Sequence, residues 1–225
     1  MARNEPFLTG VILAMASNEP FLTGVILAAG ASRRMGCPKL LLPLGDRPLL
    51  QHALDAAAAS RLDEIVLVLG DRAAVVLAAI RLPSRLPVRV AVNEDPASGQ
   101  SRSLRLGFRL ADPRASAAAI LLGDQPRVTG PLIDRVVAAF LGAGAPVVRP
   151  VYCGSHQRGV PGHPVLVDRR IWPEVETLRG DEGMRGLLAR KPEWLLEVPV
   201  EGEPPGDVDT PEDYRSAAAA AEARE

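Results

Sequence analysis

Cysteine is scarce in this 225-residue sequence, which contains only Cys37 and Cys153 and no CxxC pair. A disulfide framework and a cysteine zinc site both require closely grouped cysteines, so the sequence argues against both. The three histidines show no HxxxH spacing either, which makes a histidine zinc site improbable. We expect a protein of a reducing compartment and therefore a cytoplasmic location.

The sequence also has no excess of either charge and no long apolar run. Its 26 basic and 27 acidic residues give a formal net charge of -1, whereas a nucleic-acid-binding protein usually carries a basic excess. No apolar run approaches the roughly 18 residues that span a bilayer. The apolar N-terminal stretch lacks the basic start of a signal peptide and is broken by Glu5, Pro6, Glu19 and Pro20. We expect neither a nucleic-acid partner nor a membrane segment.

The N-terminus contains a short tandem copy. Residues 1–14 read MARNEPFLTGVILA and residues 15–28 read MASNEPFLTGVILA. A single short copy at one end is not a solenoid repeat. Only the second copy continues into the glycine-rich loop described below, so Phe21–Ala28 should be the true first strand. We expect residues 1–15 to be a dispensable extension and residues 16–225 to form one domain.

Apolar β-prone runs alternate with segments of helical periodicity along the chain. This alternation predicts βαβ units and an α/β fold, a Rossmann-like three-layer domain with a mainly parallel sheet. The expected strands are 24–28, 64–69, 88–92, 118–122, 146–150 and 164–167, and the expected helices are 48–60, 73–80, 101–110, 131–141 and 211–221. Ligands of such sheets bind beyond the carboxyl ends of the strands, and the distinctive loops follow Ala28, Val92 and Leu122.

The first of these loops, Leu27–Lys39, reads LAAGASRRMGCPK. Small residues after a strand let backbone N–H groups approach a phosphate, and Gly30 can adopt backbone angles that other residues avoid. Arg33, Arg34 and Lys39 add positive charge suited to a triphosphate. The loop is neither a Walker A motif nor GxGxxG, and the absent GxGxxG argues against a dehydrogenase. From residue types alone, an ordinary turn with solvated arginines explains it equally well.

Two acidic motifs lie in later loops. Asp124, in ILLGDQP, directly follows a buried strand and could hold Mg²⁺ against a triphosphate, although an Asp that caps the next helix is the alternative. In GDVDTPEDY, Asp207 and Asp209 should face opposite sides of an extended segment. Thr210 should cap a helix that opens with Pro211.

A third loop, NEDPASGQSRSLRLG at Asn93–Gly107, offers polar groups at a helix start that suit a base or ribose edge. An ordinary helix cap is the alternative with about even weight.

Five motifs in one order, LAAGASRRMGCPK, GQSRSL, GDQP, GHPV and DVDTPED, resemble those of the MobA-like NTP transferases, whose fold is nucleotide-diphospho-sugar transferase-like. The resemblance spans residues 22–214. Ala29 and GQSRSL are most similar to the branch that makes molybdopterin cytosine dinucleotide, the MocA-type cytidylyltransferases. The guanylyltransferase branch typically has LAGG in place of LAAG.

The resemblance implies the roles of individual residues. Lys39, Arg34 and Asp124 would be catalytic, and Asp124 and Asp209 would bind Mg²⁺. The acceptor would contact Gln125, His163, Asp181 and Arg185. The nucleotide would contact Leu27, Ala28, Ala29, Gly30, Ser32, Arg33, Arg34, Lys39, Asn93, Gly99, Gln100, Ser103 and Asp124. His52 and His156 receive no role.

The resemblance thus implies an enzyme that transfers CMP from CTP to molybdopterin and releases pyrophosphate, with a molybdoenzyme as a further partner. Three alternatives remain open at this point: GTP or another NTP as the donor, another phosphorylated acceptor such as a sugar phosphate, methylerythritol phosphate or phospholactate, and a non-catalytic chaperone that binds the molybdenum cofactor.

Overall fold

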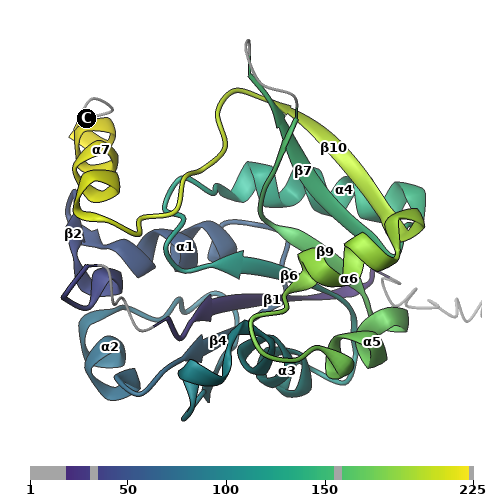
Figure 1. Ribbon diagram of the computed structural model, residues 1–225, viewed down its shortest axis with the longest axis horizontal. Coiled ribbons are helices and arrows are strands. Elements are labelled where there is room, and N and C mark those ends of the chain that lie inside the picture. Colours follow the sequence, from purple (N-terminus) through teal and green to yellow (C-terminus); the bar gives the residue numbers. More distant parts are fainter. Residues whose placement is uncertain (1–18, 31–34, 155–158, 223–225) are drawn as a thin grey trace, which may run out of the picture.

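The computed structural model describes residues 19–30, 35–154 and 159–222, which form a mixed sheet with helices on both faces (Figure 1). The strand order is β10-β7-β9-β6-β1-β4-β5, and β8 pairs with β7. The strands of this sheet are β1 (Phe21–Ala28), β4 (Glu64–Leu69), β5 (Val88–Val92), β6 (Ala115–Leu122), β7 (Val147–Cys153), β8 (Val160–Pro161), β9 (Val165–Asp168) and β10 (Leu195–Glu201). The α-helices are α1 (Leu49–Ala58), α2 (Ala73–Ala79), α3 (Gln100–Leu110), α4 (Gly130–Ala143), α5 (Trp172–Thr177), α6 (Met184–Arg190) and α7 (Pro211–Glu222).

The centre of the sheet is parallel and buried on both faces. All six residues of β4 are buried, and seven of the eight residues of β1 are buried. Strand β1 pairs in parallel with both β4 and β6, so Leu27 lies between Val68 and Leu122. Continuous apolar runs are what strands covered on both faces require. The predicted three-layer, mainly parallel α/β fold is confirmed.

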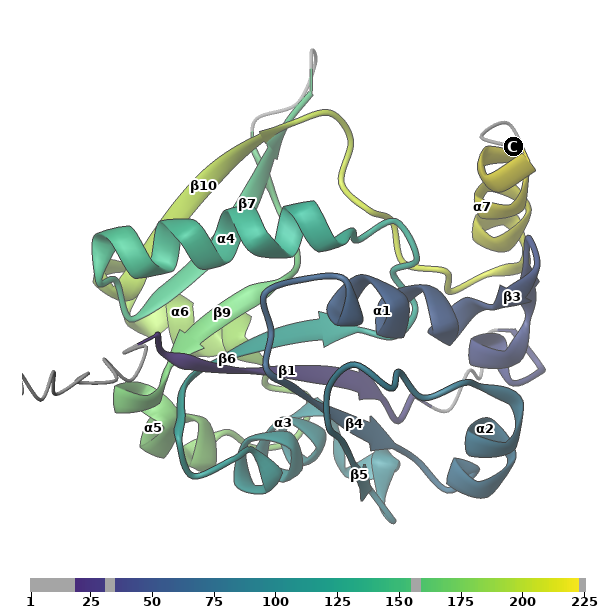
Figure 2. The same cartoon turned by 180° about the vertical axis from the view of Figure 1, so that it is seen from behind.

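Two apolar cores lie on opposite faces of the sheet (Figure 2). On one face, α1, α2 and α4 contribute buried side chains such as Leu54, Val76 and Ile133. On the other face, α3, α5 and α6 contribute side chains such as Phe108 and Leu187. The two cores fix the strands from both sides and therefore hold the loops at their carboxyl ends in place.

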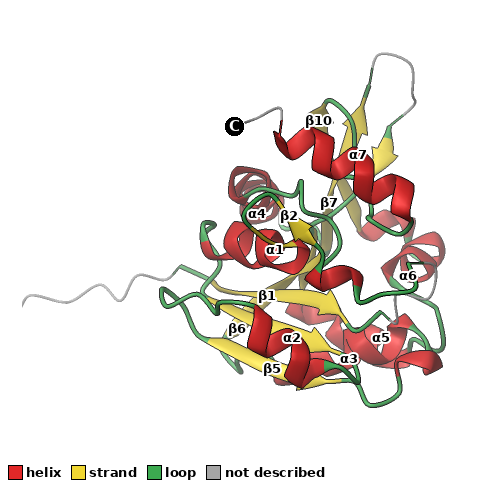
Figure 3. Ribbon diagram, turned by 90° about the vertical axis from the view of Figure 1, so that its left-hand side faces the viewer, coloured by secondary structure: helices red, strands yellow, loops and turns green. Residues whose placement is uncertain are grey.

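A third, smaller core joins the C-terminal helix to a hairpin. Strands β2 (Pro43–Leu44) and β3 (Arg47–Pro48) pair antiparallel just before α1. Helix α7 packs its alanine-rich side near β2, where Leu44, Leu49 and Val208 are buried (Figure 3). The predicted helix at 211–221 is confirmed to within one residue. This packing brings the segment before α7 back to the edge of the sheet.

The structure differs from the sequence prediction chiefly after residue 146. Strand β7 extends to Cys153 and β8 pairs back on it, so part of the expected polar loop is a hairpin. Strand β9 runs antiparallel to both β6 and β7. Strand β10 and helices α5 and α6 were not predicted, because β10 is a half-exposed edge strand and the helices have only six and seven residues. In the described ranges, no helix is both long and apolar enough to span a membrane.

Candidate functional site

Lys39 joins two acids that lie 85 and 170 residues further along the chain. Its Nζ donates to Oδ2 of Asp124 at 2.5 Å and to Oδ1 of Asp209 at 2.6 Å. The Lys39 side chain is 8% exposed, while the Asp124 and Asp209 side chains are 21% and 30% exposed. The three predicted site residues therefore lie in one place, with the lysine enclosed and both carboxylates reachable from solvent.

Backbone hydrogen bonds explain this convergence. Gly123 N–H donates to the Leu27 carbonyl at 2.9 Å, which fixes the loop after β6 against the end of β1. Val208 N–H donates to the Asp124 carbonyl at 3.0 Å, which places the next residue, Asp209, beside Asp124. These segments meet beside β1 and β6, where the strand order of the sheet reverses. Open α/β sheets bind ligands at this position.

The predicted alternation of Asp207 and Asp209 is also present. Asp209 contacts Lys39, whereas Oδ1 of Asp207 accepts from Gln125 Nε2 at 2.6 Å. Thr210 caps α7, because the Asp213 N–H donates to its hydroxyl at 3.2 Å and the Asp213 carboxylate accepts from the Thr210 N–H at 2.7 Å. This reciprocal capping box fixes the residue before it, which is Asp209.

The electrostatics of the cluster favour the charged form of Lys39. Burial alone would lower the pKa of the Lys39 ammonium, but Asp124 and Asp209 outweigh burial and raise this pKa above its ordinary value. The pKa of Asp124 is raised by burial and by the neighbouring Asp207 and Asp209, and Lys39 partly offsets this. The lysine is thus a permanent cation between acids that repel each other.

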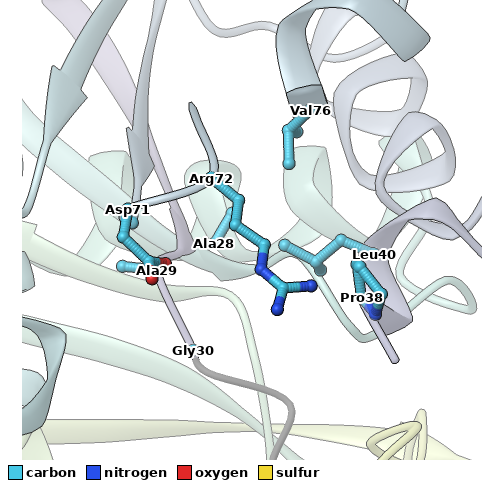
Figure 4. A pocket seen from close by; sticks show the side chains of 9 residues that line it. Ala28, Ala29, Gly30, Pro38, Leu40, Asp71, Arg72 and Val76 are labelled. Atoms are coloured by element: carbon cyan, nitrogen blue, oxygen red, sulfur yellow. The ribbon is translucent and has the colours of Figure 1, made fainter. Parts of the chain in front are cut away.

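A pocket of about 250 Å³ opens beside the glycine-rich loop, between β1 and the loop after β4 (Figure 4). Ala29 and Gly30 line one side, and the Arg72 side chain reaches across it toward Pro38. A Cβ added to Gly70 would lie 2.9 Å from the Ala29 carbonyl oxygen, so the two loops are in close backbone contact. The pocket is lined by Ala28, Ala29, Gly30, Pro38, Leu40, Gly70, Asp71, Arg72 and Val76.

Gly70, Asp71 and Arg72 of this pocket were not predicted. The sequence did contain a signal for them, because the GDR motif directly follows β4 in the same way as the GDQ motif directly follows β6.

The predicted polar residues around α3 form two groups. Asn93 and Ser103 are buried and bond each other, with Asn93 Nδ2 donating to Ser103 Oγ at 2.9 Å. They connect the end of β5 to α3. Gly99 and Gln100 instead meet the segment before α6, where Ser101 N–H donates to the Gly180 carbonyl at 3.1 Å.

Gly99 has φ +102°, and a Cβ there would lie 2.5 Å from the Asp181 nitrogen. Asp181 and Arg185 have exposed side chains on this same junction. The structure therefore brings Asp181 beside the Gly99 turn.

Three enclosed polar atoms, on strand β7 and on the loops after β6 and β8, have no hydrogen-bond partner among the described residues. They are Gln125 Oε1, Tyr152 Oη and His163 Nδ1. Burial lowers the pKa of His163 to about 4, with Arg149 adding to this and Asp124 opposing it, so the ring is neutral at pH 7. A neutral ring offers a hydrogen bond and no charge. Tyr152 was not predicted, and its ring lies against Gly162, the residue before His163.

Ser32, Arg33 and Arg34 lie outside the described residues, as does His156. The predicted extension at residues 1–15 lies outside them too. His52 contacts the Leu44 carbonyl at 2.9 Å in the β2–β3 region and takes no part in the Lys39 cluster.

The MobA-like NTP transferase domain, as a family model, matches residues 24–194. The chain belongs to this family. The match runs from β1 through the α6 segment and so contains Lys39, Asp124 and His163.

Relatives of this MobA-like transferase match nearly its whole length. Purine catabolism protein PucB of Bacillus subtilis is 35% identical and covers 94% of this chain and 96% of its own. Nicotine blue oxidoreductase of Paenarthrobacter nicotinovorans is 34% identical, and the match covers 92% of this chain and 94% of that protein. Relatives with different names share the family, so the family shows the domain and its ancestry but not the substrate.

Solved structures agree with this placement. Rv0371c of Mycobacterium tuberculosis superposes with a TM-score of 0.77 at 34% identity, covering 89% of this chain and 98% of that one. The same mycobacterial protein was also crystallised in complex with manganese. A 4-diphosphocytidyl-2C-methyl-D-erythritol synthase of Anaerococcus prevotii, 18% identical with a TM-score of 0.71, shares the fold.

Asp124 and Asp209 have the donor chemistry that a divalent cation requires. Within the described residues, no group of three or more His, Cys, Asp or Glu side chains could hold a metal. Mg²⁺ commonly takes one or two protein carboxylates and completes its shell with water and phosphate oxygens. Asp124 and Asp209, joined through one ammonium group and partly exposed, provide such a pair of oxygen donors.

Proposed function

We propose that this protein is a magnesium-dependent cytidylyltransferase that transfers CMP from CTP to molybdopterin and releases pyrophosphate. The observation that carries the proposal is the meeting of Lys39, Asp124 and Asp209 beside the glycine-rich loop. A lysine and two acids from three distant segments have little reason to converge at a ligand-binding sheet edge for stability alone, because separated acids would avoid mutual repulsion.

The proposed reaction needs no protein base. The terminal phosphate oxygen of the acceptor, already an anion at pH 7, attacks the α-phosphorus of CTP. A new P–O bond forms there, and the bond to the bridging oxygen of the β-phosphate breaks, so pyrophosphate leaves with the electron pair. The protein positions the two anions and neutralises charge in the transition state.

Lys39 supplies the positive charge at the leaving group in this proposal. Its raised pKa keeps it protonated, and its burial strengthens its interaction with a phosphate. Asp124 and Asp209 would hold Mg²⁺, which when bound neutralises the triphosphate and polarises the α-phosphate. The manganese complex of Rv0371c supports a divalent cation for this family.

The donor base would lie in the pocket beside Ala29. This pocket has backbone edges from two loops and lies next to the glycine-rich segment that would hold the phosphates. Ala29 is the residue that distinguishes LAAG from LAGG, and it supports cytosine over guanine by resemblance.

The acceptor would lie on the other side of Asp124, against Gln125 and His163. Gln125, Tyr152 and His163 carry enclosed hydrogen-bonding atoms without partners, and a shift of these side chains would offer the atoms to a ligand rich in donors and acceptors, such as a pterin. Asp181 and Arg185, on the exposed segment at the Gly99 turn, would contact a more distant part of the acceptor.

A matrix of donors and acceptors tests this proposal. Purified protein with Mg²⁺ is mixed with each of four NTPs and with molybdopterin, methylerythritol phosphate, phospholactate or a sugar phosphate, and pyrophosphate is followed over time. We expect the fastest release with CTP and molybdopterin. Release with another acceptor only would retain the transferase and replace the substrate, and no release in any combination would overturn the proposal.

The oxidoreductase among the relatives supports a second candidate function. Nicotine blue oxidoreductase is about as similar to this chain as PucB is. A reduced nicotinamide nucleotide would then bind in the pocket beside Ala29, without the GxGxxG loop of the Rossmann dehydrogenases, and transfer a hydride to an organic acceptor. Oxidation of NADH by a quinone-type dye, without any pyrophosphate-forming activity in the matrix above, would favour this function.

A further inference from the structure

Four arginines form a groove on the face of α3 and α5, outside the Lys39 cluster. Arg102, Arg105 and Arg109 are spaced three and four residues apart, so they share one stripe of α3. Arg179 faces them from the segment after α5, which lies beside α3 in Figure 1. With Leu106 and Glu176 they line a depression of about 380 Å³.

The charges in this groove are unevenly compensated. Glu176 pairs with Arg109 through bonds that include one of 2.9 Å to Nε. Arg105 and Arg179, in contrast, both donate Nη1 to the same carbonyl oxygen, that of Leu178, with the Arg179 bond at 2.8 Å. A carbonyl orients a guanidinium group but does not neutralise it. Two cationic groups are therefore held within two hydrogen-bond lengths of each other, and no ion pair with a described acid is found for either.

The orientation of these two side chains leaves donors available. A guanidinium group carries five N–H bonds in a planar fork. In the described structure, Arg105 and Arg179 donate only through Nη1, to the Ser101 hydroxyl and to the backbone carbonyls of Glu176 and Leu178. Their Nε and Nη2 groups can bond an oxyanion in the paired geometry that arginine favours.

We infer that this arginine groove is a binding site for a compact multivalent oxyanion, of which a phosphate group is the simplest member. Phosphate offers several oxygens to the two forks at once and supplies the charge that the groove lacks. An acidic protein segment is the competing occupant. We favour the small anion because the two uncompensated cations converge on one point, whereas an acidic segment would call for separated ones.

The groove borders the backbone junction at the Gly99 turn, next to the proposed acceptor residues Asp181 and Arg185. Ser101 Oγ accepts from Arg105, and Ser101 N–H donates to the Gly180 carbonyl. Leu178, which both arginines contact, lies two residues before Gly180. An anion held by Arg105 and Arg179 would therefore stabilise the junction against which Gly99 packs.

Site-specific NMR can test the inference. The Nε–Hε resonances of Arg105 and Arg179 are followed in the full-length protein during titration with inorganic phosphate, and sodium chloride at matched ionic strength is the control. We expect saturable shifts of both resonances. Arg179→Gln should weaken binding by roughly tenfold, since it removes a charged, paired hydrogen bond. Arg61→Gln, which removes one exposed charge after α1, should leave binding unchanged.

Three outcomes would overturn the inference. The first is the absence of saturation up to about 10 mM phosphate, which is too weak for a built site. The second is equal weakening by Arg61→Gln and Arg179→Gln, which would show general charge attraction. The third is binding of a hexaglutamate peptide without binding of phosphate, which would identify a protein-docking surface. Because Arg179 is exposed, its replacement should not unfold the protein. A thermal melt of each variant checks this.

Discussion

Replacement of Lys39 by alanine should destabilise the protein and make its stability depend on divalent cations. The change removes the ammonium group that bonds both Asp124 and Asp209 and leaves two partly buried carboxylates close together. Loss of one partner of a fully buried pair costs about 3–5 kcal/mol. Because both acids are partly exposed, screening reduces this, and we expect a loss of about 2–3 kcal/mol in the free energy of unfolding.

Urea unfolding with and without Mg²⁺ measures this effect. A cation bound only to the native state stabilises it by about 2.7 kcal/mol at a hundred times its dissociation constant. In the Lys39→Ala variant the cation replaces the missing charge, so Mg²⁺ should stabilise the variant more than the wild type. Lys191→Ala is the control, since Lys191 lies 5.6 Å from the Trp194 ring and contacts no acid in the described structure.

The same variant should respond to pH in a defined direction. The pKa of Asp124 is already raised, and loss of Lys39 should raise it further. The repulsion is present above that folded-state pKa and disappears when the pH falls below it, because the native carboxyl then takes up a proton. The deficit relative to wild type should therefore shrink in acid. An equal deficit at pH 8 and pH 4, together with no extra gain from Mg²⁺, would refute the reasoning.

Three further variants test other parts of the site. His163→Gln should reduce the acid sensitivity of folding. The pKa of His163 is about 4 in the native state and 6.5 ordinarily, so between these pH values the unfolded chain binds a proton that the native protein does not. The wild type therefore loses roughly 3 kcal/mol of unfolding free energy as the pH falls, and urea unfolding at pH 7 and pH 4.5 measures the difference between wild type and variant. Tyr152→Phe should leave the melting temperature unchanged or raised, because the hydroxyl has no described partner, but should raise KM for the acceptor in a pyrophosphate assay. Gly99→Ala should lower stability by about 2 kcal/mol or more, since the new Cβ would lie 2.1 Å from the Gly180 carbonyl carbon at φ +102°; an unchanged melt would show that the junction is soft.

The sequence predicted the central strands well because burial on both faces leaves a continuous apolar run. Strands β4 and β5 match the expected residues, and β6 begins only three residues earlier than expected. Edge strand β10 carries no such run: its burial alternates, and it contains Pro199. A half-covered strand of this kind is defined by its partner β7, which lies far away in the sequence.

Position in the sheet predicted part of the site, including Asp124 after a buried strand, and the family resemblance supplied Asp209. Lys39, Asp124 and Asp209 were expected at one edge, and their side chains meet there. The mutual hydrogen bond of Asn93 and Ser103 was not predictable, since it depends on how α3 seats against β5. Tyr152 was missed for a similar reason. The antiparallel pairing of β7 with β8 brings the Tyr152 ring against Gly162, the residue before His163, and this pairing is not visible in the sequence.

The most direct test of the central claim compares two aspartates on one short segment. Asp209 contacts Lys39, whereas Asp207 contacts Gln125, and an asparagine at residue 207 can still accept that hydrogen bond. Magnesium-dependent pyrophosphate release from CTP and molybdopterin should fall by about two orders of magnitude or more in Asp209→Asn and stay near wild type in Asp207→Asn. Equal rates in the two variants would contradict the account, because the cation and the triphosphate would then not be held at the Lys39 cluster.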